Sequence, residues 1–179
     1  MKKAIFLDRD GVINKKPKEH DYVKRWEEMK ILPGAKKALT LIKQSGYLAV
    51  VITNQRGVAR KMMTHEDLRD MHMKLNEKMK GQIDAFYYCH HEVFENCECR
   101  KPKPGLLHKA AAELDIDLEQ SWMIGDSESD IECGFAAGTK VKMVETDGNL
   151  FLEVKQIIGS SKNRSSRVKL VSYGTKERN

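Results

Sequence analysis

The sequence predicts an α/β fold, a Rossmann-like parallel sheet with helices on both faces. Three observations lead to this prediction. Short apolar runs alternate with amphipathic helical stretches along the 179 residues. The run 47–53 is continuous and rich in β-branched side chains, as buried parallel strands are. Polar residues of catalytic type follow directly after several of the runs. Alternation of this kind implies strands joined by helical crossovers.

The expected elements follow one another at short intervals. Pro33 and Gly34 open the first helix, Gly46 closes it, and Thr64 has the residue type of an N-cap for the second. The charged segment 14–32 separates the first strand from the first helix, and we interpret it as a loop or small hairpin. The expected strands are 4–7, 47–53, 83–88, 122–124 and 141–144, with 167–173 as a candidate edge strand, and the expected helices are 33–46, 64–79, 104–114, 131–136 and 150–158.

Composition describes a soluble globular chain of one domain. Hydrophobic residues make up 40% and charged residues 32% of the sequence. The longest wholly apolar run, 48–52, is too short to cross a membrane, and the apolar stretch after Met1 stops at Asp8, too early for a signal peptide. We therefore expect a cytoplasmic monomer without a membrane partner.

The net charge of +6 lies mostly at the C-terminal end. Residues 159–179 contain six basic side chains and one acidic side chain, so residues 1–158 are close to neutral. We expect 1–158 to form the folded domain and 159–179 a basic tail. A short basic end is more often solvated than bound to nucleic acid, which makes a nucleic-acid-binding module the weaker interpretation.

Two aspartates stand where the first apolar run ends. Asp8 and Asp10 are two residues apart, and in extended chain such side chains point to the same side. Both carboxylates would then face one pocket at the C-terminal end of the strand, where open α/β sheets bind ligands. Such a pair can hold a divalent cation, or one carboxylate can attack while the other moves protons. A solvated surface pair is the alternative for this motif taken alone.

Three further elements have the residue types that a phosphate site needs. Thr53-Asn54 ends the second strand, and a hydroxyl with backbone N–H groups can hold phosphate oxygens. Arg100-Lys101 can neutralise a phosphate. Asp126 ends the fourth strand and can complete a metal site with Asp8, whereas Asp130 is expected to cap or brace the following loop. Each element alone also fits a turn or surface charge. Three of the four elements, however, follow successive strand ends, and a parallel sheet brings all such ends to one edge.

Three of the four cysteines lie within eleven residues and beside histidines. In a cytosolic chain this clustering indicates a metal rather than disulfides. Cys89-x-His91 followed by Cys97-x-Cys99 offers a closed Cys₃His set for structural zinc, and the symmetry of the spacing favours His91 over His90. The segment 89–99, called the zinc loop from here on, would position the cations Arg100 and Lys101 that follow it.

The order acid pair, hydroxyl, lysine, acid resembles the haloacid-dehalogenase superfamily over residues 2–144. The zinc loop followed by Arg-Lys-Pro resembles a branch that holds D-glycero-D-manno-heptose 1,7-bisphosphate phosphatases and histidinol-phosphate phosphatases. Residues 53–60 look more like the heptose branch. The chain departs from that branch at Arg56, where a small residue is usual, at Ser127, where a lysine often stands, and in a longer segment 14–22. These departures bear on the substrate rather than on the reaction.

The resemblance implies a Mg²⁺-dependent phosphomonoesterase that acts on a small phosphorylated sugar. Asp8 would be the nucleophile and Asp10 the general acid and base, with Mg²⁺ held by Asp8, Asp126 and the Asp10 backbone carbonyl. Thr53, the Asn54 backbone and Lys101 would hold the phosphoryl oxygens. The residues implied at the substrate end are Glu19, His20, Asp21, Tyr22, Asn54, Gln55, Arg56 and Arg100.

The implied reaction removes the C7 phosphate of D-glycero-D-manno-heptose 1,7-bisphosphate. Histidinol phosphate is the alternative substrate, followed by a general sugar phosphatase and by a phosphatase of nucleic acid ends. The sequence has no insertion large enough for a separate cap domain, so the segment 14–32 and the zinc loop are expected to close the site.

Overall fold

The computed structural model describes residues 1–18 and 21–159. Its sheet has five parallel strands in the order β3-β2-β1-β4-β5. The strands are β1 (Lys3–Leu7), β2 (Tyr47–Asn54), β3 (Ala85–Cys89), β4 (Trp122–Gly125) and β5 (Lys140–Met143), and the helices are η1 (Trp26–Glu28), α1 (Ala35–Gln44), α2 (His65–Lys78), η2 (Val93–Glu95), α3 (Gly105–Leu114), α4 (Glu128–Ala136) and a final helix over 150–159. The predicted α/β architecture is confirmed.

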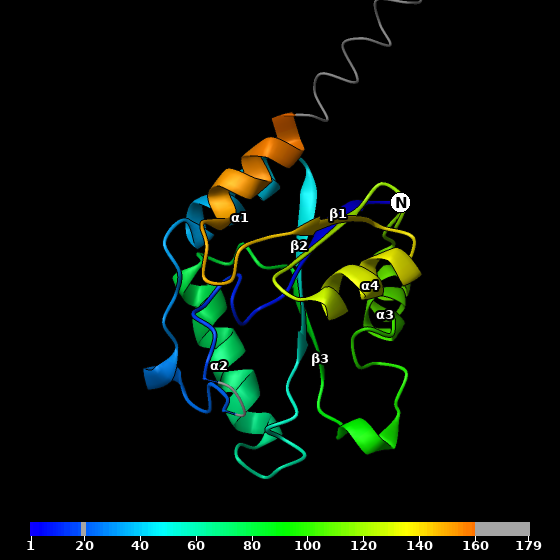
Figure 1. Cartoon of the computed structure of the whole chain (residues 1–179). Helices are drawn as coiled ribbons and strands as arrows, with labels where there is room; N and C mark the ends of the chain where they lie inside the picture. Colours follow the sequence, from blue (N-terminus) through cyan, green and yellow to red (C-terminus); the bar gives the residue numbers. More distant parts are fainter. Residues whose placement is uncertain (19–20, 160–179) are drawn as a thin grey trace, which may run out of the picture.

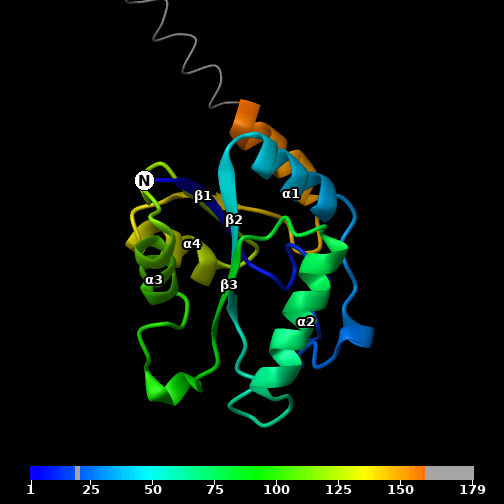
Figure 2. The same cartoon turned by 180° about the vertical axis from the view of Figure 1, so that it is seen from behind.

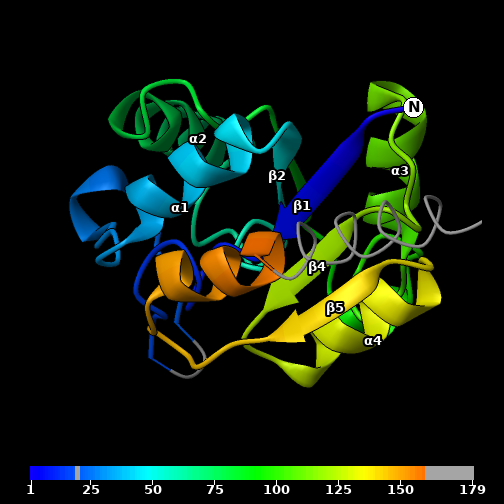
Figure 3. The same cartoon turned by 90° about the horizontal axis from the view of Figure 1, so that it is seen from above.

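Helices cover both faces of the sheet, as Figures 1 and 2 show from opposite sides. Side chains of β1 alternate between the two layers because successive residues of a strand point to opposite faces. Ile5 and Leu7 pack with α1, the end of α2 and the final helix. Ala4 and Phe6 pack with α3 and α4. Seen from above, the sheet lies between these two groups of helices (Figure 3).

Local sequence signals explain where the helices begin. Thr64 caps α2 and forms the predicted N-cap, with Asp67 completing a reciprocal capping box. A second capping box, between Ser127 and Asp130, starts α4 at Glu128, three residues before the first apolar position that marked the helix in the sequence. Asp130 thus has the capping role that the sequence predicts.

The described part of the segment 14–32 is a loop whose two ends pair, in agreement with the prediction. Asn14 bridges to Ile31 in antiparallel sense, and the backbone N–H of Lys15 donates to the carbonyl of Lys30. η1 lies within it. Together with the segment 55–63, the loop packs on a small apolar cluster centred on Leu68 of α2. This apolar cluster therefore supports the loop where it passes the C-terminal edge of the sheet.

Two predictions about the ends of elements are refined by the structure. The third strand runs to Cys89, so the first predicted zinc ligand lies on the strand itself. The final helix reaches residue 159. The candidate edge strand 167–173 and the tail from residue 160 onward lie outside the described residues.

Candidate active site

The C-terminal ends of three adjacent strands bring the predicted site together. Asp8 follows β1, Thr53 lies near the end of β2, and Asp126 follows β4. Because β2, β1 and β4 are neighbours in a parallel sheet, their C-terminal ends share one edge. A cavity of about 260 Å³ opens at this edge. It is lined by Asp8, Asp10, Thr53, Asn54, Lys101 and Asp126, together with Lys16, Pro17, Lys18, Asp21, Tyr22, Ser127 and Ser129.

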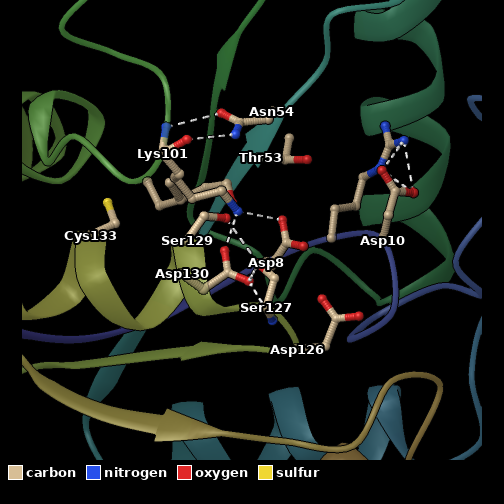
Figure 4. Close-up of polar contacts among 12 residues, drawn as sticks. Asp8, Asp10, Thr53, Asn54, Lys101, Asp126, Ser127, Ser129, Asp130 and Cys133 are labelled. Carbon is tan, nitrogen blue, oxygen red and sulfur yellow. Dashed lines mark hydrogen bonds and ion pairs between the residues drawn. The ribbon is translucent and has the colours of Figure 1, made fainter. Parts of the chain in front are cut away.

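Lys101 is the buried cation of the site (Figure 4). Its Nζ donates to Asp8 Oδ1 at 2.7 Å, to the carbonyl of Ile52 at 3.0 Å and to Asp130 Oδ1. The side chain of Asn54 holds the backbone of Lys101 at both polar atoms: Nδ2 donates to the carbonyl and Oδ1 accepts from the N–H, each at 3.2 Å. The end of β2 therefore positions the lysine directly.

The carboxylate of Asp8 is in a low-polarity environment with a single cationic partner. Burial raises the pKa of Asp8 to about 7, an increase that Lys101 opposes and that Asp130 and Asp10 reinforce. A divalent cation at this carboxylate would favour its ionised form, which is the form that attacks. The environment of Asp8 thus suits a nucleophile that is activated by positive charge.

Asp10 lines the same cavity, but its carboxylate is held by a separate set of donors. Arg9 Nη2 donates to both oxygens at 2.9 and 3.0 Å, and the amides of Asn14 and Gln55 each donate at 2.8 Å. Burial alone would raise the pKa of Asp10, but the Arg9 guanidinium and the two amide hydrogen bonds outweigh it and lower the pKa below its usual value. Asp10 is therefore an anion in this state.

Arg9 is itself fully buried and has a second partner. Its Nη1 lies 3.2 Å from Nε2 of His72, whose ring stacks on Phe86. A guanidinium can only donate, so Nε2 accepts and the imidazole is neutral. Burial, followed by the charge of Arg9, lowers the pKa of His72 to about 3. His72 is buried on α2, and it supports the Arg9–Asp10 pair.

The residues around Asp126 fit a hard cation. Asp126 Oδ2 accepts from Lys16 Nζ at 2.7 Å and from Thr146 Oγ1 at 2.8 Å, whereas the buried Oδ1 has no hydrogen-bond partner. A Cβ at residue 11 would overlap this carboxylate, which explains Gly11, whose φ is +93°. An unpartnered buried carboxylate oxygen beside Asp8 is an arrangement that fits Mg²⁺, which prefers oxygen ligands.

Carboxylate oxygens of Asp8, Asp126 and Asp130 lie within 4.8 Å of one another. Both oxygens of Asp130 are already engaged, one by Lys101 and the other by the N–H and hydroxyl of Ser127 at 3.1 and 2.6 Å. Asp8 and Asp126 are therefore the members with capacity for a metal. The carboxylate of Asp10 is outside this cluster; its backbone carbonyl stays the predicted third ligand.

The soft ligands form a second cluster, on the zinc loop. One atom from each of Cys89, His91, Cys97 and Cys99 lies within 4.8 Å of the others. His91 Nδ1 is 3.2 Å from the Cys99 sulfur, and Cys97 lies 3.4 and 3.6 Å from the sulfurs of Cys99 and Cys89. Tetrahedral zinc ligands at usual bond lengths are roughly 3.4 to 3.8 Å apart. These four residues can bind structural zinc, and the cluster contains His91 rather than His90.

The residues expected at the substrate end take different positions. Asp21 and Tyr22 line the cavity. Gln55 is fully buried and donates to Thr53 Oγ1 as well as to Asp10, which leaves the threonine hydroxyl hydrogen free to donate to a ligand. One guanidinium nitrogen of Arg100 is buried without a partner. Glu19 and His20 lie outside the described residues.

Sequence reasoning missed two contributors, Arg9 and Lys16. Arg9 was visible as the residue between the two aspartates, but its partner His72 is 63 residues away. Lys16 lies in the longer segment 14–22; its Nζ pairs with Asp126, and its backbone N–H donates to Asp147 Oδ1 at 2.7 Å. A lysine in a loop of several lysines carries no signal of its own.

Known proteins share this fold and these sequence features. The HAD-hydrolase-like family model matches residues 98–155. D-glycero-beta-D-manno-heptose-1,7-bisphosphate 7-phosphatases from Helicobacter pylori and Haemophilus ducreyi are 42% and 37% identical to this chain; the matches cover 77% and 82% of the chain and 80% and 85% of those proteins. The D,D-heptose 1,7-bisphosphate phosphatase from B. bronchiseptica, solved with magnesium and phosphate, superposes with a TM-score of 0.81 at 30% identity, covering 88% of this chain and 99% of that one.

Proposed function

The chain belongs to the HAD-like hydrolase family that contains the heptose-bisphosphate phosphatases, and we propose that it removes the C7 phosphate of D-glycero-D-manno-heptose 1,7-bisphosphate. It is a phosphoric monoester hydrolase of that family. The names of the relatives specify the β anomer and favour a heptose over histidinol phosphate. The observation that carries the proposal is the convergence of Asp8, Lys101, Thr53 and an unpartnered Asp126 oxygen on one cavity.

We propose that Asp8 attacks the phosphorus in line with the sugar oxygen. The bond between the Asp8 carboxylate and phosphorus forms as the bond to the sugar oxygen breaks, which gives an aspartyl-phosphate and the free alcohol. Lys101 and the Thr53 hydroxyl donate to the phosphoryl oxygens as negative charge builds on them. Asp8, Asp126 and the Asp10 carbonyl would hold Mg²⁺, which when bound would supply positive charge against the repulsion between carboxylate and phosphate.

Asp10 moves the protons in both halves of this reaction. It protonates the departing sugar oxygen first, and then takes a proton from the water that attacks phosphorus and regenerates Asp8. The Arg9 charge and the amide hydrogen bonds favour the anionic form of Asp10, the form needed for the second half. A phosphate dianion bound beside Asp10 favours proton uptake, because a nearby like charge raises a carboxyl pKa.

The expected partner is a small phosphorylated sugar. Among the described residues no helix is both long and apolar enough to span a bilayer. A monomeric state and a cytoplasmic location stay predictions; sedimentation of the zinc-loaded protein at micromolar concentration tests the first. A nucleic-acid-binding module would leave the carboxylates at the sheet edge without a purpose, because they repel phosphate.

A phosphate-release screen tests the proposed substrate. Heptose 1,7-bisphosphate, a hexose bisphosphate and histidinol phosphate are compared with Mg²⁺ and with a chelator. We expect kcat/KM to be at least about tenfold higher for the heptose than for either competitor, and activity to require Mg²⁺. Equal or greater activity on histidinol phosphate would overturn the substrate assignment, and no release from any ester would overturn the function.

A further inference from the structure

Three loops meet beside the cavity, and each contributes one polar side chain to the same contact. Tyr22 belongs to the loop 14–32, Arg56 to the loop 55–63, and Glu92 to the zinc loop, directly after the zinc ligand His91. Tyr22 also lines the cavity itself. A contact among these three residues therefore ties the part of the cavity wall that contains Tyr22 to the two other loops.

Arg56 makes that contact. Its Nε donates to the Tyr22 hydroxyl at 3.1 Å, and its Nη1 lies 3.7 Å from Glu92 Oε2. The Arg56 and Glu92 side chains are only 20% and 19% exposed. Arg60 also reaches Glu92, through Nε at 2.9 Å, but no contact joins it to Tyr22 among the described residues. Arg56 is thus the residue that spans all three loops.

The backbone beside Arg56 reinforces the position of Tyr22. A Cβ at Gly57 would stand 2.9 Å from Tyr22 Cγ, closer than side chains normally approach. The tyrosine ring therefore packs closely against Gly57, and the Arg56 guanidinium donates to its hydroxyl. The position of the ring in the cavity wall depends on these two residues.

Arg100 and Arg56 differ in the partners of their guanidinium groups. Arg100 has a buried guanidinium nitrogen with no partner, so it has a donor to offer an anion. Arg56 has a carboxylate and a phenol as partners already. A ligand could still reach Nη2 of Arg56 while these two contacts stay in place, but one that recruited Arg100 would satisfy a buried donor that has no partner.

We propose that Arg56 is a positioning residue that ties Tyr22 to the zinc loop and so sets the width of the substrate end, rather than a direct ligand of the second phosphate. The inference rests on the proposed function for its kinetic test. Substrate affinity then depends on the three-loop contact whichever phosphate ester is bound. A direct phosphate ligand would instead matter only for a substrate with two phosphates.

Kinetics of Arg56→Ala, Tyr22→Phe and the double variant separate these roles. KM is measured for heptose 1,7-bisphosphate and for p-nitrophenyl phosphate, with Mg²⁺ present. We expect each single variant to raise KM about three- to tenfold for both esters with little change in kcat, and the double variant to be no worse than Arg56→Ala. Arg56→Lys should be as impaired as Arg56→Ala, because one ammonium cannot reach both Tyr22 and Glu92.

Arg60→Ala is the matched control, since it removes a cation from Glu92 without touching Tyr22. We expect its KM to stay within about twofold of the original. A KM increase confined to the bisphosphate and largely rescued in Arg56→Lys would overturn the proposal in favour of a phosphate ligand. Additive effects of Arg56→Ala and Tyr22→Phe would overturn it too, because residues acting through one contact do not add.

A second readout does not depend on catalysis. Amide hydrogen exchange of the zinc-loaded protein should speed up in residues 21–24 and 91–95 of Arg56→Ala and stay unchanged in Arg60→Ala. Unchanged exchange in both segments would overturn the three-loop contact. If the protein released no phosphate from any ester, the proposed function would fail while this measurement still decided the structural part.

Discussion

The two aspartates that open the site differ more than their spacing suggests. Asp8 meets one buried lysine and has a pKa raised to about 7 by burial, whereas the charge of Arg9 and hydrogen bonds from Arg9, Asn14 and Gln55 lower the pKa of Asp10. The site thus has two parts. On the Asp8 side a buried carboxylate meets a buried cation, and on the Asp10 side a carboxylate held by several donors is placed for proton transfer. Environments that push the pKa values of two carboxyls apart indicate distinct roles in catalysis.

Gln55 contacts both the Asp8 side and the Asp10 side of the site. Its Nε2 donates to Asp10 Oδ2 at 2.8 Å and to Thr53 Oγ1 at 2.9 Å. One amide therefore supports the proton carrier and orients a phosphate-binding hydroxyl. Gln55 was expected to contact the substrate, but it instead holds two residues that line the cavity.

The largest expected effects are on kcat and on phosphoenzyme formation when either aspartate is replaced by asparagine. Asp8→Asn should lower kcat by about 10³-fold or more and form no phosphoenzyme, because the amide is not a nucleophile. Asp10→Asn should lower kcat by roughly 10²- to 10⁴-fold but accumulate aspartyl-phosphate with p-nitrophenyl phosphate, whose leaving group needs no proton. Intact-mass measurement after rapid acid quench detects the difference.

Zinc content serves as the control for both variants and should remain unchanged. A phosphorylated Asp8→Asn protein would exclude Asp8 as the nucleophile. Absence of phosphoenzyme in Asp10→Asn, combined with a normal rate of the first half-reaction, would show that Asp10 is not the base of the second half.

An intermediate effect is expected on the Asp8 side when zinc is lost. Cys97→Ser should release the zinc and reduce kcat about 10- to 100-fold, because the loop that aims Lys101 loses its cross-link while Asp8 and Asp126 stay on their strands. Elemental analysis measures the metal, and phosphate release measures the rate. Cys133→Ser, at a buried cysteine outside the cluster, is the matched control. Full zinc content in Cys97→Ser would contradict the ligand assignment.

The smallest effect concerns stability on the Asp10 side. The pKa of His72 falls from 6.5 to about 3 on folding, so the unfolded chain takes up a proton that the folded chain refuses. Stability from this residue is present above pH 6.5 and is lost as the pH falls toward 3, with a slope of up to about 1.4 kcal/mol per pH unit. His72→Phe should flatten this slope between pH 6.5 and 5, as measured by urea unfolding.

The comparison is made between variants at each pH, so that any loss of zinc in acid affects all of them alike. His108→Phe, on the exposed surface of α3, should keep the original slope. Parallel stability curves for the original protein and His72→Phe would show that the imidazole does not stay neutral on folding.

Much of the fold and half of the site could be predicted because periodicity and strand ends are local signals. Asp8, Thr53 and Asp126 could be placed together from their positions alone, since a parallel sheet aligns its C-terminal ends. His91 could be selected from the symmetry of the cysteine spacing. These predictions needed no knowledge of side-chain packing.

The remaining site depends on contacts between distant residues. A buried arginine such as Arg9 is stable only with partners, and the neutral His72 that accepts from it lies on a different element. Asn54 was expected to act through its backbone, yet its side chain is what holds Lys101. Lys16 reaches Asp126 across 110 residues. Nothing in the local sequence encodes such pairings.

The amide of Asn54 has a further consequence for how this enzyme can change over time. At one end of the zinc loop, that amide fixes the backbone of Lys101 to the end of β2. At the other end, Cys89 is part of β3. The residues between these two anchors, 92–96 above all, can drift in length and character without displacing the ammonium from Asp8. Selectivity for the sugar can therefore evolve independently of phosphoryl transfer.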